Sequence, residues 1–230
     1  MPAPYTAVGL IPTVRGVRSR AEIQRNLEHL SHLMAAASWL SSLDLPVRLV
    51  AIPEGALQGF TDEVFDMDHV TYARECAIDI PGEETEALGV IAKEYNAFVM
   101  AQAKARHPDW PDRYFNVGFI LNPRGKVILK HYKVSPLFPV EHSVCPHDVY
   151  DWWVEKYGKT LDAFWPVADT VQACDSLGGD AHANTDSTPR CRHVDARVAD
   201  DDTAPGGGGP ARDLPSIPDW RCAVAAVGGR

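Results

Sequence analysis

Apolar runs of strand length alternate with amphipathic helical segments over the first 170 residues, and this alternation limits the possible folds most. Residues 5–11 and 47–52 are continuous apolar runs, as expected of buried strands. Ser19 and Glu22 have the spacing of a capping box, which predicts that a helix begins there. Its apolar positions recur three and four residues apart and form one stripe: Ile23, Leu27, Leu30 and Met34.

The pattern continues with a second helix and a hairpin. Residues 82–96 predict a helix with Leu88, Ile91 and Tyr95 on one face, and residues 97–103 predict the next strand. Two further apolar segments flank the turn sequence Asn-Pro-Arg-Gly at 122–125, which predicts a β-hairpin. The order of elements therefore indicates an α/β layered domain with a mixed sheet.

The character of the chain changes abruptly after about residue 170. Residues 171–230 contain no Lys, Glu, Phe, Tyr or Met, and Trp220 is their one aromatic residue. Such a segment buries too little apolar surface to offset the entropy lost on ordering. Ala, Gly, Arg, Pro and Asp dominate it, and all five have GC-rich codons. We therefore expect residues 1–170 to form the folded domain and 171–230 to be a disordered or out-of-frame tail.

Charge and composition exclude several classes of partner. The net charge of -9 argues against nucleic acids and anionic membrane surfaces, because both require a basic face. No apolar stretch approaches the roughly 18 residues that a membrane span needs, and no basic segment precedes an apolar core as in a secretory signal. Five cysteines without tight spacing indicate reduced thiols. We expect a cytoplasmic protein whose partner is a small molecule.

Three charged residues are candidates for a catalytic site. Glu54 directly follows the apolar strand 47–52, and active-site groups gather at the carboxyl ends of strands in α/β sheets. Lys133 ends the second strand of the hairpin, and Glu141 lies shortly after it. Taken singly, each position also suits a solvated side chain or a helix cap.

Two motifs resemble those of the nitrilase superfamily of carbon–nitrogen hydrolases. P-E-x-x-x-x-G at residues 53–59 is similar to the first motif, and N-P-x-G-x-x-x-x-x-H-Y-K at 122–133 is similar to the second. The spacing from Lys133 to Glu141 is closest to the aliphatic amidase and formamidase branch. The resemblance implies an α-β-β-α sandwich, here incomplete at its C-terminal end, and homo-oligomers of paired sandwiches if the chain is full length. It also implies hydrolysis of a small amide or nitrile without a cofactor or a metal.

The implied chemistry is a Glu-Lys-Cys mechanism. A cysteine thiolate attacks the amide carbon and forms a thioester, which divides one difficult step into two easier ones. Glu54 would accept the thiol proton, donate it to the departing amine and later activate water. Lys133 would place positive charge beside the developing oxyanion. Glu141 would orient the substrate or Lys133.

The nucleophile of this mechanism has no recognisable motif in the chain. In the family it follows another strand in a stretch such as G-x-x-x-C, and residues 164–170 resemble the approach to that strand. Cys174 is the nearest thiol and precedes Asp175, but it falls several residues too early and follows no apolar strand. Two functions therefore remain open: an amide or nitrile hydrolase, and an inactive relative that binds a ligand or a subunit.

A zinc site is a third alternative. Glu141, His142, Cys145 and His147 are all possible ligands, but their spacing matches no closed four-ligand pattern. A polar loop is the simpler interpretation of this stretch.

Overall fold

The computed structural model describes residues 4–41, 43, 45–60, 67–137, 140–168 and 170. The chain divides into two units, Met1–Leu177 and Gly178–Arg230, and all the described residues belong to the first. The predicted tail at 171–230, and Cys174 within it, lie outside the described residues.

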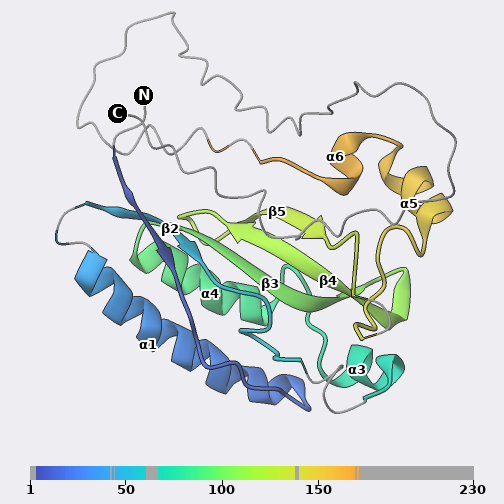
Figure 1. Ribbon diagram of the computed structural model, residues 1–230, viewed down its shortest axis with the longest axis horizontal. Helices are drawn as coiled ribbons and strands as arrows, with labels where there is room; N and C mark the ends of the chain where they lie inside the picture. The colour runs from blue at the N-terminus through green and yellow to red at the C-terminus, as the bar shows by residue number, and fades with distance from the viewer. Residues whose placement is uncertain are drawn as a thin grey trace, which may run out of the picture. The chain divides into compact units, whose positions relative to one another are not determined.

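One mixed sheet of five strands, in the order β1-β2-β3-β4-β5, organises the described part of the chain (Figure 1). Its strands are β1 (Thr6–Gly9), β2 (Val47–Ala51), β3 (Phe98–His107), β4 (Trp110–Leu121) and β5 (Val127–Tyr132). β1, β2 and β3 run parallel, whereas β3–β4 and β4–β5 are antiparallel pairs. The mixed sheet predicted from the alternation of elements is confirmed.

Two long helices pack against one face of this sheet (Figure 1). The α-helices among the described residues are α1 (Ile23–Ser41), α3 (His69–Glu75), α4 (Glu83–Glu94), α5 (Tyr150–Tyr157) and α6 (Leu161–Phe164). All four residues of the predicted α1 stripe are buried, and they pack with Val50, Val99 and Phe119 of the strands. Each such side chain contributes about 1.5–3 kcal/mol by leaving water, so this interface fixes which face of the sheet the helices cover.

The hairpin between β4 and β5 forms as predicted. The side chain of Asn122 accepts hydrogen bonds from the backbone of Arg124 and Lys126, both at 3.0 Å. Gly125 has a φ of 72°, a left-handed conformation that favours glycine. The turn fixes the register that carries Lys133 to its position after β5.

The start of the first helix differs from the prediction. Ser19 makes no side-chain capping bond, and a short 3-10 turn, Arg20–Glu22, precedes α1. Glu22 instead accepts a hydrogen bond from the backbone N–H of Arg18 at 3.2 Å. The predicted capping box was therefore wrong, because the carboxylate of Glu22 bonds the N–H of Arg18 and not that of Ser19.

The helix α3 was not anticipated from the sequence. Asp68 caps it by accepting hydrogen bonds from the backbone N–H groups of Val70 and Thr71. Tyr72 then packs against Tyr114 of β4, with ring centroids 4.6 Å apart. α3 thereby covers part of the sheet near the C-terminal end of β3.

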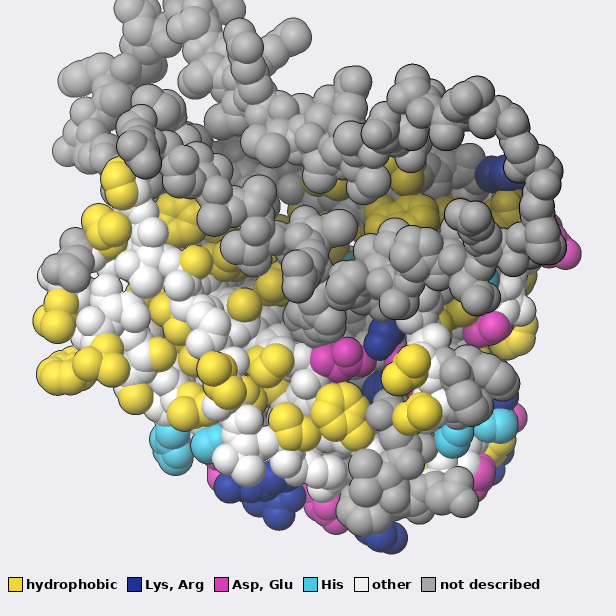
Figure 2. Space-filling view, viewed as in Figure 1, with side chains coloured by type: hydrophobic (Ala, Val, Ile, Leu, Met, Phe, Trp, Pro, Cys, Tyr) yellow, Lys and Arg dark blue, Asp and Glu magenta, His cyan; other side chains and the backbone are white. Residues whose placement is uncertain are grey.

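The α1–α4 layer and the sheet form one α-β half of the predicted sandwich, and the described residues contain no second sheet. Leu49 and Met100, on the sheet face opposite these helices, are half-buried. Figure 2 shows further hydrophobic side chains at the edge where α1 ends, and Trp39 and Leu40 are mostly exposed there. Among the described residues, no helix has the length and apolarity that crossing a membrane requires.

Candidate active site

Glu54 is held at the end of β2 by a tight turn. Gly55, the next residue, has a φ of 79°, and a Cβ there would lie 2.6 Å from the ring of Phe60. The backbone N–H of Gly55 donates a hydrogen bond to Oε1 of Gln102 on β3, at 3.1 Å. Gly59 closes the motif at a φ of 66°, where a Cβ would lie 2.5 Å from Cα of Gly16. Glycine at both positions lets the turn close tightly behind Glu54.

Lys133 and Glu141 both follow β5, the strand at the other edge of the sheet from β1. The backbone N–H of Lys133, directly after β5, donates to the carbonyl of Asn116 on β4 at 2.8 Å. The backbone N–H of Glu141 donates to the carbonyl of Leu137 at 2.8 Å. Val144 then forms a β-bridge with Phe115, which ties the segment after Glu141 to β4.

The three predicted residues meet in one cluster. The ammonium of Lys133 lies 3.3 Å from Oε1 of Glu54 and 2.9 Å from Oε2 of Glu141. One cation therefore bridges two carboxylates that are far apart in the sequence.

Asn116 joins the same two carboxylates through its side-chain amide. Its Nδ2 donates to Oε1 of Glu54 at 2.5 Å and to Oε1 of Glu141 at 2.7 Å. Its Oδ1 accepts from Nε2 of Gln102 at 2.6 Å. Because the carboxylates can only accept here and Gln102 also binds the Gly55 N–H, the network fixes the orientation of both amides.

Lys104, on β3, completes the cluster beneath Glu141. Its ammonium lies 3.2 Å from Oε1 of Glu141, and Ser143 donates a hydrogen bond to the same oxygen at 2.6 Å. The side chains of Lys104 and Glu141 are 2% and 3% exposed, whereas those of Lys133 and Glu54 are 18% and 19% exposed. The cluster thus has a fully buried pair, Lys104 and Glu141, and a partly exposed pair, Lys133 and Glu54.

The contacts set the charge states of Lys133 and Glu141. Burial alone lowers the pKa of Lys133, but the hydrogen bond and charge of Glu141, helped by Glu54, outweigh burial and leave that pKa raised. Burial alone raises the pKa of Glu141. The charge of Lys104 and the hydrogen bonds from Ser143, Asn116 and Lys133 outweigh it and lower that pKa to about 2. At neutral pH the cluster therefore holds a fixed ammonium and a fixed carboxylate.

The described cysteines are poorly suited to act as nucleophiles. Cys76 is fully buried, and its thiol faces the carbonyl of Val17 at 3.7 Å. Burial, with a hydrogen bond to Asp148, raises the pKa of Cys145 to about 11, so its reactive thiolate form is scarce at neutral pH. Within the described ranges, no three His, Cys, Asp or Glu side chains gather as a metal site would require, and this includes the stretch of Glu141, His142, Cys145 and His147.

Sequence reasoning missed the residues that connect the cluster: Gln102, Lys104, Asn116 and Ser143. A signal for them does exist. Gln102 and Lys104 are two residues apart in an apolar strand, so they share one face, and the register places Asn116 opposite Lys104. To predict that these polar side chains meet, the register between β3 and β4 would have to be known.

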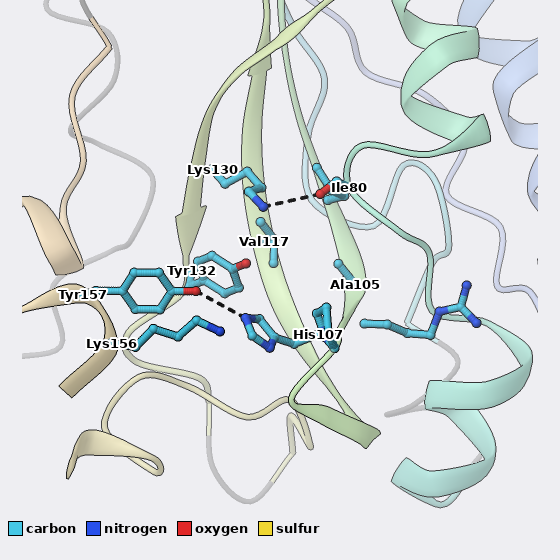
Figure 3. A pocket seen from close by; sticks show the side chains of 10 residues that line it. Ile80, Ala105, His107, Val117, Lys130, Tyr132, Lys156 and Tyr157 are labelled. Atoms are coloured by element: carbon cyan, nitrogen blue, oxygen red, sulfur yellow. Dashed lines mark hydrogen bonds between the residues drawn. The ribbon is translucent and has the colours of Figure 1, made fainter. Parts of the chain in front are cut away.

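A separate cleft of about 240 Å³ lies near α5 and does not include the three predicted residues (Figure 3). His107 and Tyr157 meet in it, with Nε2 of His107 3.3 Å from the Tyr157 hydroxyl. Nδ1 of His107 accepts a hydrogen bond from the backbone N–H of Asp109 at 3.2 Å. The proton of neutral His107 is therefore on Nε2.

This geometry predicts a pH-dependent loss of stability. Burial, followed by the charge of Lys156, lowers the pKa of His107 and outweighs the opposite effect of Asp109. The unfolded chain therefore binds a proton at higher pH than the folded chain, and stability declines as the pH falls below about 6.5. Urea unfolding at pH 7.5, 6.5 and 5.5 should show a steeper loss for the native chain than for His107→Gln. His32→Gln, at an exposed position of α1, should follow the native slope, and a native slope in His107→Gln would contradict the assignment.

Comparison with known proteins places most of the chain in one family. The family model for carbon-nitrogen hydrolases matches residues 13–178. A formamidase of Helicobacter acinonychis (strain Sheeba) is 28% identical over 126 residues, which are 54% of this chain and 35% of that protein. A formamidase of Bacillus cereus (strain AH820) is 27% identical over 126 residues, with the same coverage. The chain thus spans about a third of the length of these curated relatives.

Solved structures give partial matches. Saccharomyces cerevisiae Nit3, a member of branch 10 of the nitrilase superfamily, matches with a TM-score of 0.47 and 20% identity, over 60% of this chain and 47% of that one. A carbon-nitrogen hydrolase from Helicobacter pylori G27 matches with a TM-score of 0.43 and 14% identity, over 60% and 43%.

Proposed function

We propose that this chain, which belongs to the carbon–nitrogen hydrolase family, hydrolyses a small amide at the cluster of Glu54, Lys133 and Glu141. The observation that carries the proposal is the ammonium of Lys133, held 3.3 Å from one carboxylate and 2.9 Å from the other. The similarity to formamidases makes formamide and other short amides the first substrates to test, and nitriles the second.

Each residue has a role that suits its surroundings. Glu54 is accessible enough to reach a substrate, so it accepts the proton of a cysteine thiol and passes it to the departing amine. The thioester formed is then hydrolysed by a water molecule that Glu54 deprotonates. Lys133, with a raised pKa, remains an ammonium and stabilises the oxyanion of each tetrahedral intermediate. Glu141 remains ionised and holds Lys133 in place.

The nucleophile in this mechanism is a cysteine outside the described residues. Cys174 is the nearest in sequence, followed by Cys191 and Cys222. Serine variants at the three positions, made one at a time, identify it: one of them should lose ammonia release, because a serine hydroxyl is far less acidic than a thiol. Full activity in all three variants would exclude these cysteines as nucleophiles and contradict the mechanism proposed here.

A binding protein without turnover is the second candidate function. The observation that favours it is the burial of both described cysteines, Cys76 and Cys145, which leaves the cluster without a described thiol nucleophile. Such a protein would bind a small amide at Glu54 and Lys133 and release it unchanged. Isothermal titration calorimetry with acetamide, run beside an ammonia assay, separates the two functions.

Replacement of Lys133 provides a matched test of the cluster. Lys133→Ala should lower ammonia release by about 100-fold to 1000-fold, the loss typical of one oxyanion-stabilising group. Lys130→Ala is the control, because Lys130 lies three positions earlier on β5, is exposed, and lines the separate cleft instead. Initial rates at saturating formamide should show this loss in the first variant and native activity in the second. Retention of more than about a tenth of the activity in Lys133→Ala would remove Lys133 from the mechanism.

A further inference from the structure

Lys104 is a charged residue in the middle of a largely apolar strand. Its neighbours Ala103 and Ala105 on β3 are buried, and its own side chain is 2% exposed. Lysine is rarely buried to this extent, because removing an ammonium from water is costly unless the charge is paired. A residue with such a cost to stability is expected to have a role that offsets it. The ammonium of Lys104 contacts Glu141, so that role is expected in the cluster around Glu141.

The contacts of Glu141 divide between its two oxygens. Oε1 accepts hydrogen bonds from Lys104, Asn116 and Ser143, at 3.2, 2.7 and 2.6 Å. Oε2 accepts from Lys133 at 2.9 Å and from the backbone N–H of Leu137 at 3.4 Å. Lys104, Asn116 and Ser143 therefore hold the carboxylate of Glu141 in one orientation, with Oε2 turned toward Lys133.

The charges of the cluster alternate in sign. Glu54, Lys133, Glu141 and Lys104 form a row of carboxylate, ammonium, carboxylate and ammonium, with a net charge of zero. Glu54 follows the end of β2, and Lys133 directly follows β5. Glu141 lies in the segment after β5, and Lys104 is on β3. The other described groups that donate hydrogen bonds to Glu141 are neutral: Asn116, Ser143 and the backbone N–H of Leu137. Without Lys104, the negative charge of Glu141 would act on Lys133 without compensation.

We infer that Lys104 is a positioning residue: through Glu141 it holds the Lys133 ammonium between the two carboxylates, where Glu54 and a substrate can share it. This inference deepens the proposed amide hydrolysis and depends on it for its catalytic meaning. The placement of Lys133 itself can be measured without turnover.

Amine labelling reports on Lys133 directly. Acetic anhydride reacts with the neutral amine, and mass spectrometry of peptides gives the rate at each lysine. Removing Lys104 removes a nearby positive charge and leaves Glu141 uncompensated, and both changes favour the protonated form of Lys133. A shift of about one pH unit in its titration would slow its labelling about tenfold at fixed pH. Lys130, in the same digest, is the internal control and should label at an unchanged rate.

Three variants separate a positioning role from a structural one. Lys104→Met removes the charge and the hydrogen bond. Lys104→Gln removes the charge but keeps a donor for Glu141, so it satisfies the buried oxygen if the methionine variant does not fold. Lys104→Arg keeps the charge and should restore the native labelling rate at Lys133. A purely structural role would reduce stability in the first two variants without changing the labelling of Lys133 in the folded protein.

The pH profile of ammonia release gives the second readout. Lys104→Gln should raise the pH at which activity falls on the acidic side, because Glu141 without the charge of Lys104 binds a proton more readily. Slower labelling of Lys133 in the uncharged variants, with the native rate in Lys104→Arg, supports the positioning role. Equal labelling in every variant overturns it. If the native chain releases no ammonia, the proposed function fails while the labelling still decides the role of Lys104.

Discussion

Glu54→Gln is expected to lower ammonia release from a small amide by about a thousandfold, within the range that a general acid–base group contributes. Glutamine has nearly the same shape as glutamate, and its carbonyl oxygen can still accept hydrogen bonds from Asn116 and Lys133. It cannot take up the proton of a thiol or of water. The geometry of the cluster therefore survives while proton transfer is lost.

The control for this variant is the same exchange at an exposed position. Glu94→Gln, at the end of α4, removes one carboxylate without contact to the cluster and should retain native activity. Thermal unfolding of both variants should show that they are folded. If Glu54→Gln keeps more than about a tenth of the native rate, another group performs the proton transfers.

Glu141→Leu is expected to lower the free energy of unfolding by about 3–5 kcal/mol, the loss typical when one partner of a buried ion pair is removed. Lys104 would then remain buried without the carboxylate at 3.2 Å that offsets its charge. Urea unfolding of the native chain and the variant at pH 7 measures the difference. A loss below about 1 kcal/mol would show that Glu141 does not compensate Lys104 as described.

The double variant Lys104→Met/Glu141→Leu is the matched control. It replaces both buried charges by apolar side chains of similar volume, which is often neutral or stabilising. Its free energy of unfolding should therefore recover toward the native value. Recovery would assign the loss in Glu141→Leu to the lost ion pair between Lys104 and Glu141 and not to poor packing of leucine.

The same pair predicts how acid affects the protein. The folded chain holds the pKa of Glu141 at about 2, below its usual value of 4.5, so the unfolded chain binds a proton first as the pH falls. The stability that Glu141 contributes is present above about pH 4.5 and is lost between there and about pH 2. Glu141→Leu should lack this acid-dependent loss.

Much of the fold could be predicted because its signals are local. The apolar stripe of α1, the strand at 47–52 and the Asn-Pro-Arg-Gly turn each depend on residues close together in the sequence. Glu54 and Lys133 directly follow β2 and β5, whereas Glu141 was singled out by its spacing from Lys133 and by the resemblance to the amidase and formamidase branch. The structure brings both carboxylates within 3.3 Å of the Lys133 ammonium, and the catalytic roles stay a prediction.

The rest depends on contacts that a single segment does not encode. Lys104 is in a strand whose sequence is largely apolar. Its contact with Glu141 depends on the register of β3 against β4 and on the path of the chain after β5. α3 has only seven residues, too few for a clear periodic stripe, and its start depends on the Asp68 cap. At Ser19 the expected cap failed because the Arg18 N–H competes for the carboxylate of Glu22.

The most direct test of the central claim is ammonia release from formamide by the native 230-residue chain, measured in proportion to protein concentration. Hydrolysis at the Glu54–Lys133–Glu141 cluster predicts more than one ammonia per chain, which shows repeated turnover. A folded chain that releases no ammonia from formamide, acetamide or a short nitrile would contradict the hydrolase function and leave a ligand-binding role for the cluster.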